Sequence, residues 1–399
     1  MRVFIIGQGY VGLSIATAAA SAGHQVVGFD INQELIQKLS NSKSHIEGIS
    51  GEKLLELSGS EKLFFSSDPS CMKDSEVIIV AVPTPLDSNR QPDLTYVHNA
   101  VDLIIEYANS RALIVNESTS FPGTLRDEIA ARISIKSDLA HDYASAPERV
   151  DPGNPRFNVK NTPRVVAGLS DDASKNVYEF YSSFCDYVTV VSTPEVAETA
   201  KLLENTFRQV NIALVNQMAL ITEKLGISIH DVVEAAATKP FGYMKFNPGL
   251  GVGGHCIPVD PTYLLHAAKR AGIPATFIEL ANQVNEDMAE NIINIVESRI
   301  DESLVGKNVC VVGVTYKSDV ADLRESPSLE LIARLRSQGS NVKWHDTLIK
   351  NWNGEESSDV ENGDIVIVAV VHSDLDRQKL FSARYVFDCT GKLPEFDTF

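Results

Sequence analysis

Short apolar runs alternate with amphipathic segments in the first half of the chain. Six runs have the length and β-branched composition of buried strands: VFIIG, QVVGFD, EVIIVAVP, ALIVNES, DYASAPE and RVVAG. The segments between them have helical spacing. Because parallel strands need crossovers that are usually helical, this alternation predicts a parallel sheet with helices on both faces.

The pattern changes at about Pro194, where a long helix is predicted to run to about Leu225. Its apolar positions repeat near the helical period, at Val196, Leu202, Leu203, Phe207, Val210, Leu214, Met218 and Ile221. A helix of this length needs a partner to cover its apolar stripe. We therefore expect it to join two domains or two subunits.

After about Gly306 the strand–helix alternation returns and repeats the start of the chain. The run NVCVVGVTY is similar to VFIIGQGY, so that Gly313 and Tyr316 are spaced like Gly7 and Tyr10. The sequence thus predicts an α/β protein in which a helical core joins two Rossmann-like, doubly wound domains. We expect its three domains at 1–193, 194–300 and 301–399.

Composition and charge narrow the class of protein. The 399 residues are 44% hydrophobic, which is typical of a globular chain. A net charge of −18 argues against nucleic acid or an anionic membrane as a partner. No stretch approaches the roughly 18 apolar residues of a membrane span. The five cysteines have no paired spacing, which favours free thiols and a cytoplasmic location.

A dinucleotide-binding motif follows the first predicted strand. Gly7 permits the tight turn, Gly9 lets the backbone approach a pyrophosphate, and Gly12 allows close helix packing. Asp30 ends the next strand, where it would accept the ribose hydroxyls and repel a 2′-phosphate, so NAD is favoured over NADP. A plain glycine-rich turn is the alternative. The predicted cofactor contacts in this motif are Gly7, Gly9, Tyr10, Val11, Gly12 and Asp30.

Two further predicted strands end in polar or turn residues. Pro83 and Thr84 follow one strand, and Ser118 and Thr119 follow the next. Ligands of open α/β sheets bind outside the carboxyl ends of strands, so we expect these residues near the cofactor. Taken alone, they are also typical of turns and helix caps.

The segment 246–261, FNPGLGVGGHCIPVDP, crowds four glycines ahead of Cys256. A single cysteine is more often buried and inert than reactive. A glycine-rich loop that admits a ligand, followed by Asp260, reverses that expectation and predicts a reactive thiol. Asp260 is also a candidate N-cap of the helix that begins with Pro261.

Lys201 and Asn205 stand four residues apart on the long helix and therefore on one face. A lysine there can stabilise an oxyanion that the asparagine orients. Spacing alone favours the alternative of a solvated lysine paired with Glu198 or Glu204.

Together these segments resemble the UDP-glucose/GDP-mannose dehydrogenase family. The family's motifs occur in order over essentially the whole chain: GQGYVG, VPTP, ESTSFPGT, APER, Lys-x-x-x-Asn, GVGGHCIPVDP and GVTYKSDVADLRESP. The resemblance implies an NAD-binding Rossmann domain, a helical dimerisation core and a UDP-binding domain. It also implies a UDP-sugar substrate and a homodimer or dimer-based oligomer.

The resemblance further implies oxidation of the sugar C6 alcohol to a carboxylate in two hydride transfers to NAD. Cys256 matches the nucleophile that forms a thiohemiacetal and then a thioester. Asp260 and Lys201, through a water near Thr119, would manage the hydroxyl proton. Lys201 and Asn205 would hold the oxyanion of the thiohemiacetal.

Other positions match by the same resemblance. Glu148 would direct the water that hydrolyses the thioester, and Arg324 would reach the cofactor from the last domain; surface salt bridging is the alternative for Arg324 and Lys317. The substrate contacts that the resemblance implies are Glu148, Arg149, Lys201, Asn205, Phe246, Gly249 and Lys317.

Two motifs bear on the substrate. Members that act on UDP-glucose are similar to CFPKD around the cysteine and PEFLRE around the glutamate, whereas here Val259 replaces the lysine and RVDPGN follows Glu148. HCIPVDP with PERVDPGN is more similar to members that act on UDP-N-acetylhexosamines. UDP-GlcNAc, UDP-ManNAc or UDP-GalNAc is therefore favoured, with UDP-glucose as the alternative.

Two other classes share parts of this pattern. A β-hydroxyacid dehydrogenase would have the Rossmann domain and the Lys-x-x-x-Asn helix but would transfer one hydride without a thiol; Cys256 and the third domain argue against it. A redox sensor that binds NAD would need no Lys201, Glu148 or Asp260. The nine histidines lack ligand spacing such as HExxH, so no metal is expected.

Overall fold

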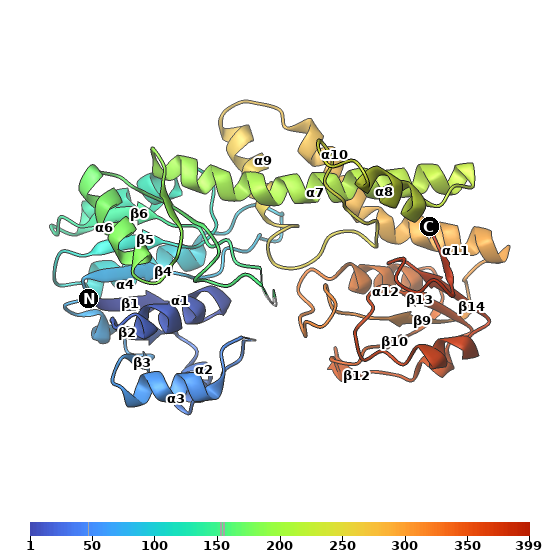
Figure 1. The fold of residues 1–399 in the computed structure, drawn as a ribbon, viewed down its shortest axis with the longest axis horizontal. Helices are drawn as coiled ribbons and strands as arrows, with labels where there is room; N and C mark the ends of the chain where they lie inside the picture. The colour runs from blue at the N-terminus through green and yellow to red at the C-terminus, as the bar shows by residue number, and fades with distance from the viewer. Residues whose placement is uncertain (47, 152–153, 155) are drawn as a thin grey trace. The chain divides into compact units, whose positions relative to one another are not determined.

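The computed structural model describes residues 1–46, 48–151, 154 and 156–399. The chain forms two compact units: Met1–Glu204 with Thr262–Ala271, and Asn205–Pro261 with Gly272–Phe399. The division falls inside the long helix α7 (Pro194–Leu225), which has the bounds that the apolar pattern predicts (Figure 1).

An eight-stranded sheet in the order β3-β2-β1-β4-β5-β6-β7-β8 forms the centre of the first unit. Its strands are β1 (Arg2–Ile6), β2 (Gln25–Phe29), β3 (Leu63–Ser66), β4 (Val77–Val80), β5 (Leu113–Asn116), β6 (Asp142–Ser145), β7 (Arg164–Gly168) and β8 (Val188–Val190). The first six pair in parallel in the strand order of dinucleotide-binding folds. Every residue of β4 and β5 is buried, as in a sheet with helices on both faces.

One expectation about this sheet is wrong, because β7 pairs antiparallel with β6. A parallel pair needs a long crossover, which is usually helical. The described residues between β6 and β7 contain no helix. The chain therefore turns back along β6, and β8 continues parallel to β7.

Helices pack against the first sheet, and several begin at polar caps. They are α1 (Tyr10–Ser21), α2 (Gln33–Ser40), α3 (Gly51–Gly59), α4 (Thr95–Tyr107), α5 (Ala131–Lys136) and α6 (Asp171–Ser182). Asn32, Ser50 and Ser170 precede α2, α3 and α6, and each side chain accepts a hydrogen bond from the N–H three residues on. Such caps satisfy an N–H group that the helix itself leaves unpaired.

The second unit contains a five-stranded parallel sheet in the order β10-β9-β13-β14-β15. Its strands are β9 (Asn308–Val312), β10 (Asn341–His345), β13 (Ile365–Val368), β14 (Tyr385–Asp388) and β15 (Asp397–Thr398). A small hairpin, β11 (Asn351–Trp352) with β12 (Glu355–Glu356), lies outside this sheet. The observed α/β class with two such sheets confirms the predicted fold class.

The helices of the second unit are α8 (Ile229–Ala237), α10 (Thr276–Glu286), α11 (Met288–Ile300) and α12 (Pro327–Ser337), together with the second half of α7. All of them except α10 contribute side chains to one hydrophobic core with the sheet. Val215 of α7, Ile292 of α11 and Val311 of β9 belong to the same buried cluster. Most of the helical middle of the chain is thus packed with the C-terminal sheet.

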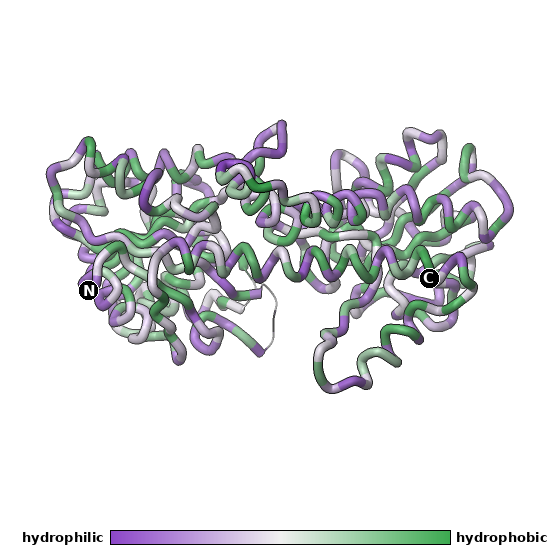
Figure 2. Tube along the Cα trace, turned by 90° about the horizontal axis from the view of Figure 1, so that it is seen from above, coloured by the Kyte–Doolittle hydropathy of each residue, from purple (hydrophilic) through white to green (hydrophobic). Residues whose placement is uncertain are grey.

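Hydrophobic and hydrophilic positions follow one another along α7 (Figure 2). Several of its apolar side chains are exposed and form a stripe. It consists of Val196, Leu203, Phe207, Leu214, Ile221 and Leu225. Their spacing of four or seven residues places them on one face of the helix. No helix in the described part of the chain is long and apolar enough to cross a membrane.

Candidate active site

The three glycines of the first loop have different neighbours. A Cβ at Gly7, where φ is +94°, would lie 2.5 Å from the carbonyl oxygen of Ala81, and one at Gly12 would lie 1.8 Å from that of Gly7. Backbone packing therefore requires glycine at both positions. A Cβ at Gly9 would meet no described atom within 4 Å. The protein leaves that space open, as the predicted approach of a pyrophosphate requires.

The surroundings of this loop also suit a dinucleotide. Helix α1 begins directly after Gly9, with no side-chain cap from the described residues, so its first N–H groups point to an anion site. The carboxylate of half-buried Asp30 accepts hydrogen bonds from the N–H groups of Gln8 (2.8 Å) and Asn32 (2.9 Å). Lone pairs remain on both oxygens for ribose hydroxyls.

The loops that follow β4 and β5 are joined directly. The Ser118 hydroxyl donates to the carbonyl oxygen of Val82 at 2.7 Å. Thr84 is buried, Pro83 is exposed and Thr119 is half-buried. Because β4 and β5 are parallel neighbours, these loops leave the same edge of the sheet as Gly7 does, as the sequence predicted.

Glu148 lies in the chain just after β6, where it is buried and surrounded by hydrogen-bond donors. Its Oε2 accepts from Nη2 of Arg164 at 2.8 Å, and its Oε1 accepts from the N–H groups of Arg149 (2.6 Å) and Val150 (2.7 Å). Burial acts to raise the pKa of Glu148, but the charge of Arg164 and these hydrogen bonds together hold it below its ordinary value. Glu148 is therefore a carboxylate at neutral pH.

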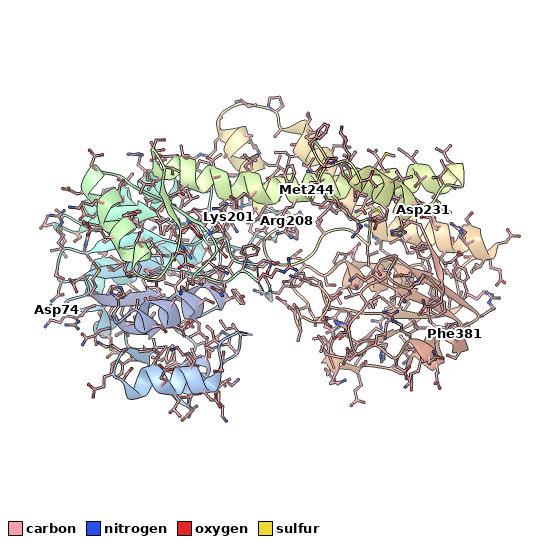
Figure 3. All side chains as sticks on the ribbon, viewed as in Figure 1. Asp74, Lys201, Arg208, Asp231, Met244 and Phe381 are labelled. Carbon is pink, nitrogen blue, oxygen red and sulfur yellow. The ribbon has the colours of Figure 1, made fainter. Side chains whose placement is uncertain are left out.

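Lys201 lies on α7 (Figure 3) and is only 9% exposed. Glu198 accepts hydrogen bonds from the N–H groups of Gly123 and Leu125, and Glu204 pairs with Arg149. The alternative of a solvated lysine paired with either glutamate is therefore wrong. Among the described residues, no ion-pair partner of the Lys201 ammonium is found.

One turn later on α7, Asn205 lies in the second unit and contacts Asp260. Its side-chain amide donates to Oδ2 of Asp260 at 2.5 Å, and both side chains are buried. Asp260 stands at the start of α9 (Asp260–Arg270), and its N–H donates to the carbonyl oxygen of Cys256 at 2.9 Å. The structure thus brings together Asn205, Asp260 and the cysteine loop.

The exposure of Cys256 distinguishes it from the buried cysteines. Burial raises the pKa of Cys185 to about 11 and that of Cys310 to about 12, and it also raises the pKa of Cys389 well above its ordinary value. Thiols of this kind form little thiolate, which is the nucleophilic form. Cys71 is half-buried, whereas Cys256 is exposed.

The glycines before Cys256 serve contacts within the protein. A Cβ at Gly251, where φ is +128°, would lie 2.7 Å from the carbonyl oxygen of Asn285. A Cβ at Gly253 or Gly254 would lie within 2.9 Å of the Tyr316 side chain. The interpretation that these three glycines make room for a ligand is therefore wrong, because they fit the loop against its own unit.

The substrate contacts implied at the start of this loop have protein neighbours as well. A Cβ at Gly249 would have its nearest neighbour, the carbonyl oxygen of Cys389, 4.0 Å away, so space remains beside this glycine. The Gly249 N–H donates to Oδ1 of Asn216 at 2.9 Å. The half-buried ring of Phe246 meets that of Phe207 edge to face, with centroids 6.0 Å apart.

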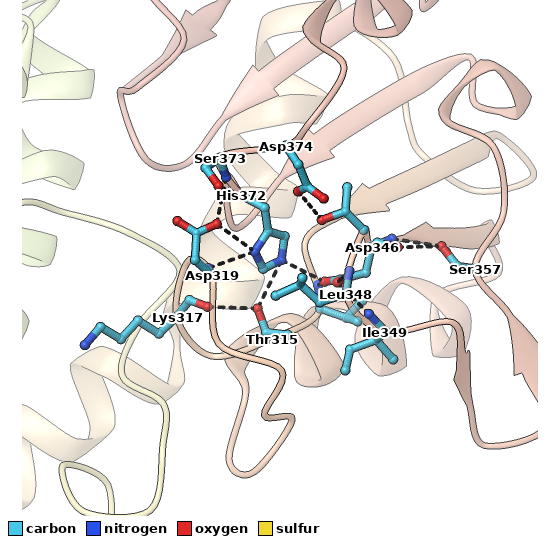
Figure 4. Close-up of polar contacts among 12 residues, drawn as sticks. Thr315, Lys317, Asp319, Asp346, Leu348, Ile349, Ser357, His372, Ser373 and Asp374 are labelled. Atoms are coloured by element: carbon cyan, nitrogen blue, oxygen red, sulfur yellow. Dashed lines mark hydrogen bonds and ion pairs between the residues drawn. The ribbon is translucent and has the colours of Figure 1, made fainter. Parts of the chain in front are cut away.

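At the end of the second sheet, a buried histidine ties three strand ends together (Figure 4). The N–H of Asp319 donates to Nδ1 of His372 at 2.9 Å, so the ring proton is on Nε2, which donates to Oδ2 of Asp346 at 3.1 Å. The Thr315 hydroxyl donates to the carbonyl oxygen of Lys317 at 3.0 Å. Together these bonds hold the turn that carries Lys317, whose side chain extends away from the cluster (Figure 4).

Two predicted arginines have acidic neighbours. Arg324 pairs with Asp322, with Nη2 and Oδ2 2.6 Å apart, and its carbonyl oxygen accepts from the N–H of Gly254. Arg149 pairs with Glu204 at 2.5 Å. Their contacts with the cofactor and the substrate stay predictions. Among the described residues, no group of three or more His, Cys, Asp or Glu that could hold a metal ion is found.

Sequence reasoning missed Arg164, Glu198, Asp346 and His372. Arg164 begins an otherwise apolar strand, and a charged residue there is ordinarily exposed. The internal repeat could have identified Asp346, because it ends the second strand of its sheet as Asp30 does. No local signal marks His372.

Comparisons with known proteins match the whole chain. Three models of the UDP-glucose/GDP-mannose dehydrogenase family match: the NAD binding domain at 1–185, the central domain at 195–287 and the UDP binding domain at 310–394. The chain therefore carries the family's NAD-binding and UDP-binding domains.

Curated relatives and a solved structure agree with the family models. UDP-N-acetyl-D-mannosamine dehydrogenase of Pyrococcus horikoshii is 33% identical over 94% of this chain and 90% of its own. UDP-N-acetyl-D-glucosamine 6-dehydrogenase of Pseudomonas aeruginosa is 32% identical over 94% and 91%. The solved structure of the Pyrococcus horikoshii UDP-D-ManNAc dehydrogenase superposes with a TM-score of 0.89 at 32% identity, covering 98% of this chain and 95% of that one. With all three family domains in order and relatives matched along nearly its full length, this chain belongs to the UDP-glucose/GDP-mannose dehydrogenase family.

Proposed function

We propose that this protein is an NAD-dependent UDP-N-acetylhexosamine 6-dehydrogenase, which oxidises the C6 alcohol of the sugar to a carboxylate. The observation that carries the proposal is an exposed Cys256 whose loop is bonded to the buried Asn205–Asp260 pair. A β-hydroxyacid dehydrogenase has no use for the thiol, and a redox sensor has none for Asp260. For the domains, we propose that residues 1–193 bind NAD, that residues 194–300 form a helical core and that residues 301–399 bind the UDP-sugar.

The first loop would hold the cofactor. Gly9 leaves room for the pyrophosphate, the N-terminus of α1 supplies N–H groups through Tyr10 and Val11, and Asp30 accepts the ribose hydroxyls. When bound, NAD supplies the acceptor for each of the two hydrides. Pro83, Thr84, Ser118 and Thr119 leave the same sheet edge and would line its nicotinamide half.

The first half-reaction converts the alcohol to an aldehyde. The C6 hydroxyl loses its proton to Asp260, with Lys201 and a water near Thr119 in the relay, as a hydride leaves C6. The Cys256 thiolate then adds to the aldehyde carbon and forms a thiohemiacetal. Lys201, a buried cation, and Asn205 would stabilise its oxyanion.

The second half-reaction releases the acid. Loss of the second hydride turns the thiohemiacetal into a thioester on Cys256. Water oriented by Glu148 adds to the thioester carbonyl, the C–S bond breaks, and the carboxylate and the thiol are released. Covalent capture on Cys256 keeps the aldehyde from escaping between the two hydride transfers.

Three observations favour an N-acetylated substrate. Relatives similar over nearly the whole chain act on UDP-N-acetylmannosamine and UDP-N-acetylglucosamine by name. Val259, close to Cys256 in the chain, is buried. The lysine that is typical of UDP-glucose members at this position would have its charge buried away from solvent. The motif around Glu148, PERVDPGN, also favours an N-acetylated substrate, but its Pro152 and Gly153 lie outside the described residues.

The decisive experiment counts NADH per sugar for UDP-GlcNAc, UDP-ManNAc, UDP-GalNAc and UDP-glucose, with NAD and NADP compared. Two NADH per N-acetylated sugar are expected. Two NADH with UDP-glucose alone would overturn the substrate assignment, and one NADH per substrate would point to a β-hydroxyacid dehydrogenase. Cys256→Ser should bind NAD normally yet form no acid, and acid formation by this variant would contradict the thioester route.

We also infer a homodimer that forms through α7. Its apolar stripe is exposed along the whole helix, and an apolar hollow of about 200 Å³ lies beside it, lined by Leu214, Val233 and Met244 among others. Burying such a surface in a second copy is the ordinary way to keep it from water. A cytoplasmic location is inferred as well, because no disulfide joins the five cysteines.

A matched pair of variants tests the dimer by sedimentation. Leu214 and Phe381 are both 57% exposed, but only Leu214 belongs to the stripe on α7. Leu214→Asp should give monomers at concentrations where Phe381→Asp and the wild type are dimers. Dimers of unchanged affinity in Leu214→Asp would contradict this interface.

A further inference from the structure

A buried arginine joins two carboxylates in the first unit. Arg164, 3% exposed at the start of β7, places Nη1 2.7 Å from each oxygen of Glu117 and Nη2 2.8 Å from Oε2 of Glu148. Nη1 also donates to the carbonyl oxygen of Ala146 at 3.2 Å. The guanidinium lies over the ring of Tyr181, 4.6 Å from its centroid. One side chain thus links the ends of β5, β6 and β7.

The two carboxylates of this cluster differ in their surroundings. Glu117 is enclosed by Arg164 and by the Tyr181 hydroxyl, which donates to its Oε1, and its side chain is fully buried. The side chain of Glu148 keeps 10% of its surface exposed, and its Oε1 is held by two backbone N–H groups. Only Glu148 can therefore face a water or a substrate.

Stability alone is a poor explanation for the cluster. One guanidinium and two carboxylates leave a net negative charge in a buried place, and well-packed apolar residues often stabilise as well as buried ion pairs do. Burial raises the pKa of Glu117 to about 7, whereas the pKa of Glu148 is lowered. An excess proton therefore resides on Glu117, and Glu148 stays ionised.

We propose that Arg164 is a positioning residue for thioester hydrolysis, which holds the Glu148 carboxylate ionised and aimed at the attacking water while Glu117 anchors the guanidinium from the other side. The proposal rests on the proposed function, in which Glu148 orients that water. Arg164 also fixes the spacing between Glu148 and Thr119, because Glu117 lies two residues before Thr119 on the loop that follows β5.

The charged and titratable groups that face Glu148 come from four places. Arg164 belongs to β7, Glu117 follows β5, Cys185 lies just after α6, and Arg149 follows Glu148 itself and pairs with Glu204 of α7. Arg164 is the cation among them in direct contact with the Glu148 side chain. Its replacement should therefore change the hydrolytic step more than any other.

Rapid-mixing kinetics of NADH formation by the full-length enzyme separates this step from the oxidations. Arg164→Lys keeps a positive charge but loses the fork that spans two carboxylates. It should still give a burst of two NADH per active site at the wild-type rate, followed by a steady state roughly 100-fold slower. Acyl-enzyme on Cys256 should then accumulate and be detectable by mass spectrometry. Arg111→Lys, which alters the exposed pair with Asp142, is the matched control and should behave as wild type.

A second readout is the pH dependence of the steady-state rate. Arg164→Lys should move the acid limb to higher pH, because Glu148 protonates more easily beside a weaker partner. Glu117→Gln should leave the acid limb where it is in the wild type, with a normal burst, because Glu117 already carries a proton at the pH where Glu148 titrates. Adding Arg164→Lys to Glu148→Gln should slow hydrolysis little further, because both substitutions disable one unit.

The outcomes distinguish this inference from the proposed function. If the wild type forms no NADH with any UDP-sugar, the proposed function fails and the inference fails with it. If the wild type is active, a burst and a steady state that fall equally in Arg164→Lys, or an acid limb that does not move in this variant, overturns the inference alone. A burst followed by slow hydrolysis in Arg164→Lys, with an acid limb that moves to higher pH in this variant and stays in place in Glu117→Gln, supports it.

Discussion

The first turns of the two large sheets share one backbone arrangement. Gly7 follows β1 and Gly313 follows β9, with φ of +94° and +84°. A Cβ at Gly7 would lie 2.5 Å from the carbonyl oxygen of Ala81, and one at Gly313 would lie 2.2 Å from that of Val370. In each case the next N–H donates to an aspartate at the end of the neighbouring strand: Gln8 to Asp30 at 2.8 Å and Val314 to Asp346 at 2.7 Å.

The two aspartates then serve different purposes. Asp30 is half-buried, and α1 begins three residues after Gly7, so the carboxylate and the helix N-terminus remain available to a ligand. Asp346 is buried. His372 donates to the same oxygen, Oδ2, as the Val314 N–H does, and the N–H groups of Leu348 and Ile349 donate to Oδ1. These four internal donors give Asp346 a structural role, whereas we expect Asp30 to bind the ribose and Lys317 to meet the ligand of the second sheet. The same backbone arrangement, present twice in the chain, can in this way serve two classes of ligand.

The largest expected effect comes from removing this histidine. His372→Ala leaves the Asp346 carboxylate buried without its side-chain donor and should cost about 3 kcal/mol of unfolding free energy. The KM for the UDP-sugar should rise, while the Kd for NAD should stay unchanged. Urea denaturation and NAD titration measure these effects. His345→Ala, in which the lost ring contacts the Ser358 carbonyl, is the control. Weaker NAD binding in His372→Ala would break the comparison.

The next largest effect is a loss of folding stability in acid, which comes from Asp346 beside the second sheet. Burial acts to raise the pKa of Asp346, but the hydrogen bond from His372 and the N–H groups of Ile349 and Val314 lower it to about 2. Because the folded pKa lies below the unfolded one, this contribution is complete above pH 4 and is lost as the pH falls towards 2. The loss amounts to about 2 kcal/mol.

Unfolding experiments between pH 2 and pH 6 test this prediction. Asp346→Asn should be less stable than the wild type at pH 6 and should lose less stability on acidification. Asp30→Asn should retain the acid loss of the wild type. Equal pH slopes in the wild type and Asp346→Asn would contradict the prediction.

A smaller effect is expected at Gly9, where the protein leaves space. Gly9→Ala should fold with unchanged stability, because its Cβ meets no described atom, but it should weaken NAD binding about tenfold by narrowing the pyrophosphate site. Thermal unfolding and isothermal titration with NAD measure the two quantities. Gly12→Ala, whose Cβ would overlap the Gly7 carbonyl, should lose both. A Gly9→Ala variant with normal affinity would show that the cofactor does not approach this residue.

The smallest effect concerns Asp30 itself. Asp30→Ala should raise the KM for NAD about fivefold, in keeping with the loss of one ribose hydrogen bond of about 1 kcal/mol. It should also reduce the discrimination against NADP, because a negative charge no longer faces the 2′-phosphate. The ratio of kcat/KM for the two cofactors measures this change. An unchanged ratio would mean that Asp30 does not contact the ribose.

Much of the fold could be predicted from local patterns. Six strands of the first sheet, β9 of the second, the bounds of α7 and the turn glycines follow from periodicity or from a backbone conformation that only glycine tolerates easily. The antiparallel β7 could not be predicted in this way, because an apolar run of five residues carries no information about its direction. The absence of a helical pattern before it was the available signal.

The candidate site likewise has features that the sequence predicts and features that it does not. By itself, the sequence determined which residue types stand at the strand ends, in the glycine turns and around Cys256, since spacing along the chain sets these. Only the tertiary structure decided that Lys201 is buried, that Arg164 joins Glu117 across 47 positions, and that His372 reaches Asp346 across 26. The physical reason is that burial and charge pairing depend on segments far apart in the chain, and these determine which carboxylate stays ionised and which faces a ligand.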